Sequence, residues 1–145
     1  MDELVTLMNE MPFVSDIGIE ITAAADGRAT GQLKLEPRHS SVPDRTIAHG
    51  GVTYALADTV GGAAVLSVCG QPTPTIDMRI DYLTPAQTAL VAEATVVRNG
   101  GTVSVVEIHI SDADGIAVAD ARGVYKTSGG SGDTAWGSIK RNREQ

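Results

Sequence analysis

The sequence predicts an α+β fold in which an antiparallel sheet curls around one long central helix. One segment, residues 47–69, is apolar and alanine-rich over a length that suits a helix better than a strand. Segments of alternating apolar and polar residues flank it, and the short connections at 99–101 and 112–115 have the composition of hairpin turns. A single long apolar helix that only an antiparallel sheet can cover makes a two-layer arrangement.

Two elements are predicted before the central helix, a short helix and a β-hairpin. The helical segment has apolar residues at a spacing of three and four and begins at Asp2, a residue type that caps helices; it is expected to end before Pro12. Alternating residues then predict two strands joined by a turn at Ala25-Asp26-Gly27. The predicted ranges are 2–9 for the helix, and 17–23 and 28–35 for the strands.

The central helix is predicted over residues 48–68. A polar, proline-containing segment before it, 36–46, breaks all periodicity, and we interpret it as an active-site loop. Gly70 and Pro72 mark the end of the helix. Four strands are then expected to follow one another as an antiparallel meander. Their predicted ranges are 75–82, 88–98, 102–110 and 116–126.

The size and charge of the chain restrict its class. The 145 residues are enough for one domain with a core, expected over 1–127, and a glycine-rich, flexible tail is expected over 128–145. A net charge of −7 makes nucleic acids and anionic membrane surfaces poor partners. We recognise no membrane span of roughly 20 apolar residues and no signal pattern, so the expected location is cytoplasmic.

Metal and disulfide chemistry are not expected. Cys69 is the only cysteine, which excludes an intramolecular disulfide, and its setting at a helix end suits a small buried core residue. The three histidines, His39, His49 and His109, lack the spacing of metal ligands, and apolar neighbours on a strand favour a structural or surface role for His109. The sequence therefore predicts no metal and no cofactor.

The central helix carries two features that suit catalysis. Asp58 is its only charged residue, and burying an unpaired carboxylate costs several kcal/mol, so its position calls for a function. Gly50 and Gly51 leave N–H groups of the first turn open, where a helix N-terminus can stabilise a carbonyl oxygen that gains negative charge.

The spacing of these two features implies two copies of the chain. Gly50 and Asp58 are eight residues apart, or about 12 Å along a helix. A base or nucleophile must lie within about 3 to 3.5 Å of the reacting atom. The two can therefore cooperate only if a second copy supplies one of them, as two antiparallel helices across a twofold axis would.

Two further glycines, Gly61 and Gly62, lie beside Asp58 on the helix surface, each at a cost of around 1 kcal/mol in helix propensity relative to alanine. They could clear space for a substrate or for the partner helix. Tight packing of the sheet on the helix explains them equally well.

The motif of His49-Gly50-Gly51 with Asp58 in a small-residue-rich helix resembles the hotdog-fold acyl-CoA thioesterases of the phenylacetate-pathway, or PaaI-like, group. The flanking segments MPFVSDIGIE and PTIDMRIDYLTPA are similar to that group too, so the resemblance covers most of residues 12–127. It implies the hotdog fold, with a sheet wrapped around the central helix. It also implies hydrolysis of an acyl-CoA thioester, with coenzyme A entering only as part of the substrate.

The resemblance implies composite sites in a homodimer or a dimer of dimers. The Gly50 N–H would polarise the thioester carbonyl, and Asp58 of the other subunit would act as a general base on water or as a nucleophile. His49 is placed at the site, and Thr75 where related enzymes can carry a hydroxyl that positions water or the carboxylate. The alternative for Thr75 is an ordinary strand threonine without a catalytic role. We expect Gly51 and Gly62 to contact the substrate, and we favour Arg98 for its phosphates.

One departure from the family pattern leaves alternatives open. Related enzymes commonly carry Asn or Gln where this chain has Pro43, and Ser41 or Asp44 could take over that polar role. The missing amide is the main support for a second function, a non-catalytic acyl-CoA-binding module. A hotdog hydratase or dehydratase usually pairs an Asp with a His a few residues later on the same helix. The five residues after Asp58 include no His, so that class fits poorly.

Overall fold

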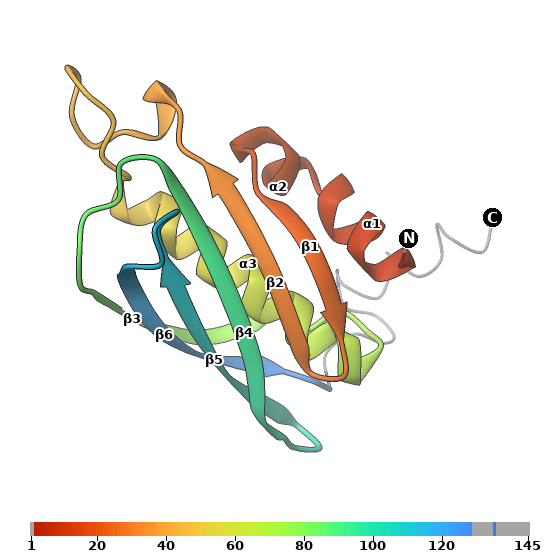
Figure 1. The fold of residues 1–145 in the computed structure, drawn as a ribbon. Coiled ribbons are helices and arrows are strands. Elements are labelled where there is room, and N and C mark those ends of the chain that lie inside the picture. Colours follow the sequence, from red (N-terminus) through yellow and green to blue (C-terminus); the bar gives the residue numbers. More distant parts are fainter. Residues whose placement is uncertain (1, 129–134, 136–145) are drawn as a thin grey trace.

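A long helix packs against one face of a curled six-stranded antiparallel sheet in the computed structural model, which describes residues 2–128 and 135 (Figure 1). Two short helices lie beside the first strand, at one edge of the sheet (Figure 1). The helices are α1 (Glu3–Glu10), α2 (Pro12–Ile17) and α3 (Gly50–Cys69), with a 3-10 turn η1 (Pro37–His39). The strands are β1 (Glu20–Ala25), β2 (Arg28–Lys34), β3 (Thr75–Tyr82), β4 (Ala89–Asn99), β5 (Val103–Ser111) and β6 (Ala117–Lys126).

The expected order of the last four strands is wrong in one respect. The sheet order is β1-β2-β4-β5-β6-β3, so β4, β5 and β6 form a meander but β3 pairs with β6 at the opposite edge. The end of α3 explains this: Gln71 Nε2 donates to Thr127 O at 2.6 Å, and Lys126 N donates to Pro74 O at 2.8 Å. The chain therefore leaves α3 beside the end of β6, and β3 pairs there. The side of β4 that β3 would have needed is already paired with β2. Cys69 at this helix end is half-buried rather than buried.

The N-terminal elements differ from the prediction after the first helix. Asp2 caps α1 as expected, since its Oδ1 accepts from Leu4 N at 2.9 Å. Pro12 does not only end a helix; it opens α2, because proline suits the first helical position, where no N–H is needed. Gly18, with φ of 93°, ends α2, and β1 therefore begins at Glu20, later than predicted.

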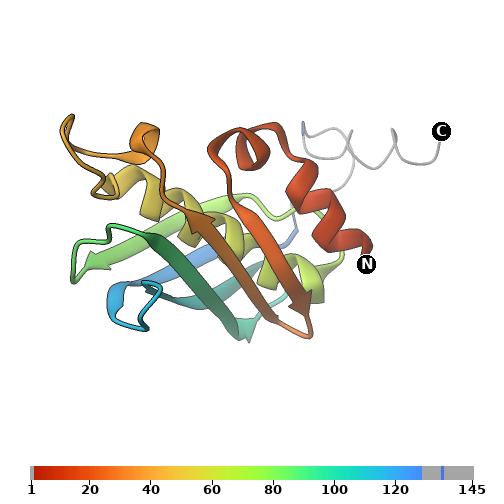
Figure 2. The same ribbon diagram turned by 45° about the horizontal axis from the view of Figure 1, so that its top comes forward.

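The first hairpin confirms the predicted turn. Asp26 and Gly27 both have positive φ, 54° and 79°, as a type I′ turn requires. This turn matches the right-handed twist of the two strands, which run antiparallel with Ala25 opposite Arg28. Figure 2 shows how this hairpin and the remaining strands curve around α3.

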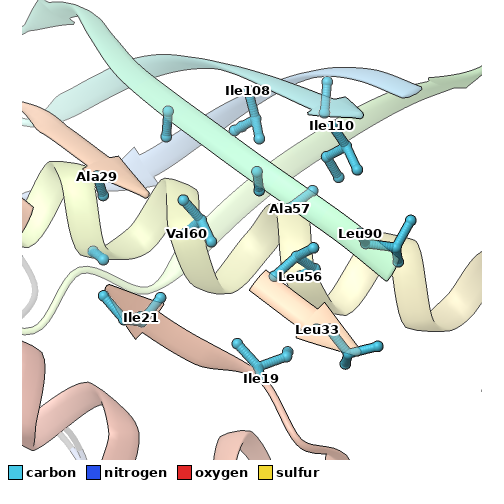
Figure 3. Packing of buried hydrophobic residues seen from close by; sticks show 14 of the residues in the cluster. Ile19, Ile21, Ala29, Leu33, Leu56, Ala57, Val60, Leu90, Ile108 and Ile110 are labelled. Carbon is cyan, nitrogen blue, oxygen red and sulfur yellow. The ribbon is translucent and has the colours of Figure 1, made fainter. Parts of the chain in front are cut away.

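The core lies between α3 and the sheet, where the helix approaches the strands closely (Figure 3). Leu56, Ala57 and Val60 of α3 are fully buried against strand residues such as Ile108. Small strand residues make this approach possible: a Cβ placed on Gly31 of β2 would lie 2.6 Å from Val60 Cγ2, far inside van der Waals contact. Helix and sheet are therefore fitted to each other at the level of single methyl groups.

The expectation of no membrane-spanning segment can be compared with α3, the most apolar helix of the described chain. By length and composition alone, α3 could cross a membrane, with a mean hydropathy of 1.5, although half of this stretch is buried inside the protein. Its apolar character has an explanation in the fold, because the helix is the core element beneath the sheet. The predicted flexible tail, 128–145, lies outside the described residues except for Ser128 and Ala135.

Candidate active site

At the N-terminus of α3, a single backbone N–H has no partner among the residues that the structure describes. His49 caps the helix: its Nδ1 accepts from Gly51 N at 2.8 Å, and its carbonyl oxygen accepts from Val52 N and Thr53 N at 2.9 and 3.3 Å. Gly50 N makes no hydrogen bond to any described residue. Of the two glycines that the sequence singled out, only Gly50 therefore presents a free donor, and Gly51 is occupied by the cap.

The peptide unit between Gly50 and Gly51 is held at both ends. Its N–H donates to His49 Nδ1, and its carbonyl oxygen accepts from Tyr82 Oη at 2.7 Å. Since His49 Nδ1 accepts a hydrogen bond, a neutral ring carries its proton on Nε2. These contacts fix the orientation of the first helical turn and hence the direction of the free Gly50 N–H.

His39 anchors this turn to the rest of the protein, a role that its sequence position did not indicate. It is 2% exposed; its Nδ1 accepts from Glu36 N at 2.9 Å and its Nε2 lies 2.7 Å from Ile17 O. Its backbone carbonyl accepts from His49 N at 2.8 Å. The segment interpreted as an active-site loop is thus tied at His39 both to α2 and to the cap of α3.

Asp58 lies farther along α3, on the side where the helix is only partly covered. Two hydroxyl groups reach its Oδ1: Thr75 Oγ1 donates at 2.6 Å and Tyr125 Oη at 3.1 Å. Tyr125 Oη is also 2.9 Å from the Asp58 carbonyl oxygen. Among the described residues, Oδ2 of Asp58 has no hydrogen-bond partner. Thr75 is therefore brought to Asp58 within one chain, as the family resemblance implied, and Tyr125 joins them.

The pKa values of three tyrosines near α3 are raised by their burial and by the Asp58 carboxylate or by one another. Burial, and secondarily the Asp58 carboxylate, raises the pKa of Tyr125 well above its ordinary value of 10.0. Desolvation also raises the pKa of Tyr54 and Tyr82, by smaller effects. Tyr125 is thus protonated over the whole physiological range and acts as a hydrogen-bond donor there.

The two helical glycines beside Asp58 have different surroundings. A Cβ on Gly61 would lie 2.7 Å from Tyr125 Oη and 3.2 Å from Ile108 Cδ1, so this glycine serves the packing of sheet on helix. A Cβ on Gly62 would meet only Tyr125 Cε1, at 3.6 Å, an ordinary contact. Gly62 is partly exposed on the Asp58 side, and its expected contact with substrate stays a prediction.

Arg98 is not close to the Asp58 cluster of its own chain. Its neighbour Asn99 faces the helix side, because Asn99 Oδ1 accepts from the buried Ser104 Oγ at 2.6 Å. The register of β4 shifts by one residue between Val96 and Arg98, and the alternation beyond this bulge therefore places Arg98 on the outer face of the sheet. Binding of substrate phosphates by Arg98 remains an untested prediction.

Pro43 lies exposed in the loop before α3. The two residues considered as replacements for the missing amide make local contacts: Ser41 Oγ donates to Ile47 O at 3.3 Å, and Asp44 forms an ion pair with Arg45 at 3.2 Å. Neither contact involves the N-terminus of α3 or Asp58, so these contacts assign the polar role of the missing amide to neither Ser41 nor Asp44.

The described part of the chain contains no group of three or more His, Cys, Asp or Glu side chains that could hold a metal ion. His109 is exposed on β5, where its Nδ1 lies 2.7 Å from Asp120 Oδ1, in agreement with the surface role considered for it.

A pocket of about 290 Å³ opens at the N-terminus of α3. It lies between the first helical turn and the connection from β3 to β4, and Gly50 and Tyr82 form part of its wall. Apolar side chains such as Ile47, Leu83 and Val118 form much of the remainder. A carbonyl group bound in this pocket would lie beside the first turn of α3, where the Gly50 N–H has no hydrogen-bond partner among the described residues. A donor in such a partly enclosed setting can stabilise developing negative charge.

Comparison with known proteins identifies the family. The model of the thioesterase superfamily matches residues 46–119, a range that contains Gly50, Asp58 and Thr75. A Halobacterium salinarum protein with a provisional esterase name is 36% identical over 127 residues, covering 78% of this chain and 82% of its own length. Human acyl-coenzyme A thioesterase 13 is 30% identical over 108 residues, covering 72% of this chain and 76% of its own.

The solved structures agree. The E. coli PaaI protein, from the phenylacetic acid degradation operon, matches with a TM-score of 0.76 and 25% identity, over 83% of this chain and 87% of its own. The resemblance noted in the sequence is thereby confirmed, together with the sheet that wraps the central helix. The chain belongs to the thioesterase superfamily, as a hotdog-fold thioester hydrolase of the PaaI-like group.

Proposed function

We propose that this protein hydrolyses acyl-CoA thioesters in composite active sites of a homodimer, alone or as half of a dimer of dimers, in the cytoplasm. The observation that carries the proposal is a pair of groups on α3 that have no hydrogen-bond partner in the described part of the chain. They are the Gly50 N–H at the start of the helix and Oδ2 of Asp58 about 12 Å farther along. Each is suited to one half of thioester hydrolysis, and neither can reach the other within one chain.

In the proposed reaction the thioester carbonyl oxygen accepts a hydrogen bond from Gly50 N–H, strengthened by the positive end of the helix dipole. Asp58 of the second subunit either removes a proton from the attacking water or attacks the carbonyl carbon to form a mixed anhydride that water then hydrolyses. In both routes the carbon–sulfur bond breaks, the sulfur leaves as the coenzyme A thiolate and takes up a proton, and water provides the oxygen of the free acid.

Three observations support the proposal, the first for its activity and the other two for its shared site. The human relative is named as an acyl-coenzyme A thioesterase. Asp58 is on the open side of α3, where a second helix can approach. The edge strand β3 is next to it and exposes apolar side chains, with Ile76 57% and the adjoining Leu83 54% accessible. Pairing of two such edges across a twofold axis would cover these side chains.

A complementation experiment tests the composite site. Asp58→Asn keeps the size of the side chain and removes the base or nucleophile. Gly50→Pro removes the N–H at the first helical position, where proline is favourable, after His49, whose extended ψ of 139° suits the residue before a proline. It also adds a Cβ that would lie 3.3 Å from Tyr82 Oη, a tight contact that an alanine at the same position shares. Gly50→Ala, which keeps the N–H, is the matched control.

The measurement is release of coenzyme A thiol from short, medium, long and aromatic acyl-CoAs. Each of Asp58→Asn and Gly50→Pro is expected to lose turnover by itself. After the two inactive proteins are mixed and allowed to exchange subunits, about one quarter of wild-type activity should return, because half of the dimers are hybrids with one intact site. No recovery despite subunit exchange would contradict the shared site.

The same assay separates the second candidate function, a non-catalytic acyl-CoA-binding module, which the proline at position 43 favours. Such a module would bind acyl-CoA in a calorimetric titration without releasing thiol from any of the four substrate classes. Full thiol release by Asp58→Asn would contradict the role given to Asp58.

A further inference from the structure

We propose that Tyr125 is a positioning residue which, together with Thr75, holds Oδ1 of Asp58 and thereby makes Oδ2 the oxygen that acts on water or on the thioester. This inference rests on the proposed function, in which Asp58 is the reactive carboxylate. It adds a residue from the last strand of the sheet and selects one of two chemically equivalent oxygens.

The two donors form a clamp from neighbouring strands. Thr75 at the start of β3 is the cross-strand partner of Tyr125 near the end of β6. Their hydroxyl oxygens approach the same carboxylate oxygen, at 2.6 and 3.1 Å, and leave the other one free. The last torsion of an aspartate side chain is broad and nearly twofold, so without such donors either oxygen could face the substrate.

A β-bulge directs Thr75 into this position. The register between β3 and β6 skips a residue between Thr75 and Asp77. Met78 faces the core, 8% exposed, and strict alternation from Met78 would put Ile76, not Thr75, on that face. With the extra residue, Thr75 points to Asp58 while Ile76 is 57% exposed. Bulges are known to re-aim a side chain near functional sites.

Space for Tyr125 is made by two glycines. A Cβ on Gly61 of α3 would lie 2.7 Å from Tyr125 Oη, and a Cβ on Gly123 of β6 would lie 2.8 Å from Tyr125 Cε2. The ring is 1% exposed and is therefore confined to one place, with its hydroxyl against Asp58. A tyrosine that only filled the core would need no hydroxyl; here the hydroxyl reaches both the carbonyl and the carboxylate of one residue.

The hydroxyl has the right chemistry for a permanent donor. Burial raises the pKa of Tyr125, so the group does not ionise where the enzyme works. A hydrogen bond to the charged form of a carboxylate favours that form.

The test compares Tyr125→Phe with Tyr54→Phe in the full chain. Both remove a phenolic hydroxyl, but Tyr54 Oη donates to Met78 O, at 3.2 Å, and makes no hydrogen bond to Asp58. Thr75→Val removes the second donor, and Thr75→Ser restores it. The readouts are kcat and kcat/KM for thiol release as functions of pH, with unfolding temperature and oligomeric state measured for each variant.

Tyr125→Phe is expected to lower kcat about tenfold, the effect of losing one hydrogen bond to a charged group, with little change in KM. The acid limb of its pH profile should move to higher pH. Thr75→Val should do the same, and Thr75→Ser and Tyr54→Phe should match the wild type. Because Thr75 is exposed, its variants test the clamp even where the loss of a buried hydroxyl lowers the stability of Tyr125→Phe.

A purely structural role predicts another pattern. In that case Tyr125→Phe would lower the unfolding temperature but leave kcat and the midpoint of the acid limb of the pH profile unchanged. This result would overturn the inference about Tyr125. An inactive Asp58→Asn in the same experiments would still support the proposed function. An active Asp58→Asn would overturn both. The two failures are therefore distinguishable.

Discussion

Alanine substitution of the two adjacent glycines in α3 should have opposite effects on stability. Gly61→Ala places a Cβ 2.7 Å from Tyr125 Oη, 3.2 Å from Ile108 Cδ1 and 3.3 Å from Val106 Cγ1. Neither the buried methyl groups nor the confined ring can withdraw easily, and overpacking of this kind typically costs about 1–3 kcal/mol. Movement of the tyrosine hydroxyl would also weaken its bonds to Asp58, at about 0.5–1.5 kcal/mol.

Helix propensity acts against this cost. Alanine is favoured over glycine by about 1 kcal/mol in a helix interior, so the net expectation for Gly61→Ala is a loss of about 0.5–3.5 kcal/mol. At Gly62 the added Cβ would lie 3.6 Å from Tyr125 Cε1, an ordinary contact, and the propensity gain stands alone. Gly62→Ala should therefore stabilise the folded chain by about 0.5–1 kcal/mol.

Urea unfolding at one protein concentration measures the difference, because association would otherwise contribute to the midpoint. The m-values of the two variants should agree, so that the shift in midpoint reports stability. Equal stability of Gly61→Ala and Gly62→Ala would refute the packing assigned to Gly61. Dissociation of the dimer by Gly62→Ala would instead show that the partner helix occupies the space beside Gly62.

Two further predictions concern tyrosines of the site. Tyr82→Phe removes the donor that holds the Gly50 carbonyl, so kcat/KM for thiol release should fall several-fold, while thermal unfolding changes little because Tyr82 is 53% exposed. Because burial raises the pKa of Tyr125 in the folded state above its unfolded value of 10.0, the contribution of Tyr125 to stability should be constant below about pH 10 and be lost as the pH rises through the range between the two values. Equilibrium unfolding at alkaline pH measures this decline, which should be weaker in Tyr125→Phe.

The sequence was informative where a physical rule acts over short range. The Asp26-Gly27 turn, the Asp2 cap and the extent of α3 all follow from local preferences of a few residues, and the structure confirms them. The choice of Asp58 as a candidate functional residue also came from a local feature. Burying a lone carboxylate in an apolar helix costs free energy wherever that helix packs, so its presence calls for an explanation. Its contact with Thr75 was anticipated only through the family resemblance.

The remaining features depend on long-range geometry. The pairing of β3 with β6 is decided by where α3 ends relative to the sheet, which hairpin signals do not encode. The bulge that turns Thr75 inward shifts the register by one residue and defeats any argument from alternation. Tyr125 could have been noticed from its alternation with Ala121 and Gly123 on a buried face, since a buried tyrosine hydroxyl needs a partner. The partner itself, on a helix 67 residues earlier, could not.

The composition of α3 is itself an argument for the composite site. A helix that serves one sheet needs an apolar stripe on one side and polar residues on the other. Yet α3 is apolar enough around its whole surface to pass for a membrane span, while only half of that stretch is buried within the chain. A helix that is hydrophobic all round is a buried helix. The open side of α3, which carries Asp58, is therefore suited to a second apolar surface rather than to water, and a copy of the same helix running in the opposite direction would bring its own Gly50 N–H to that side.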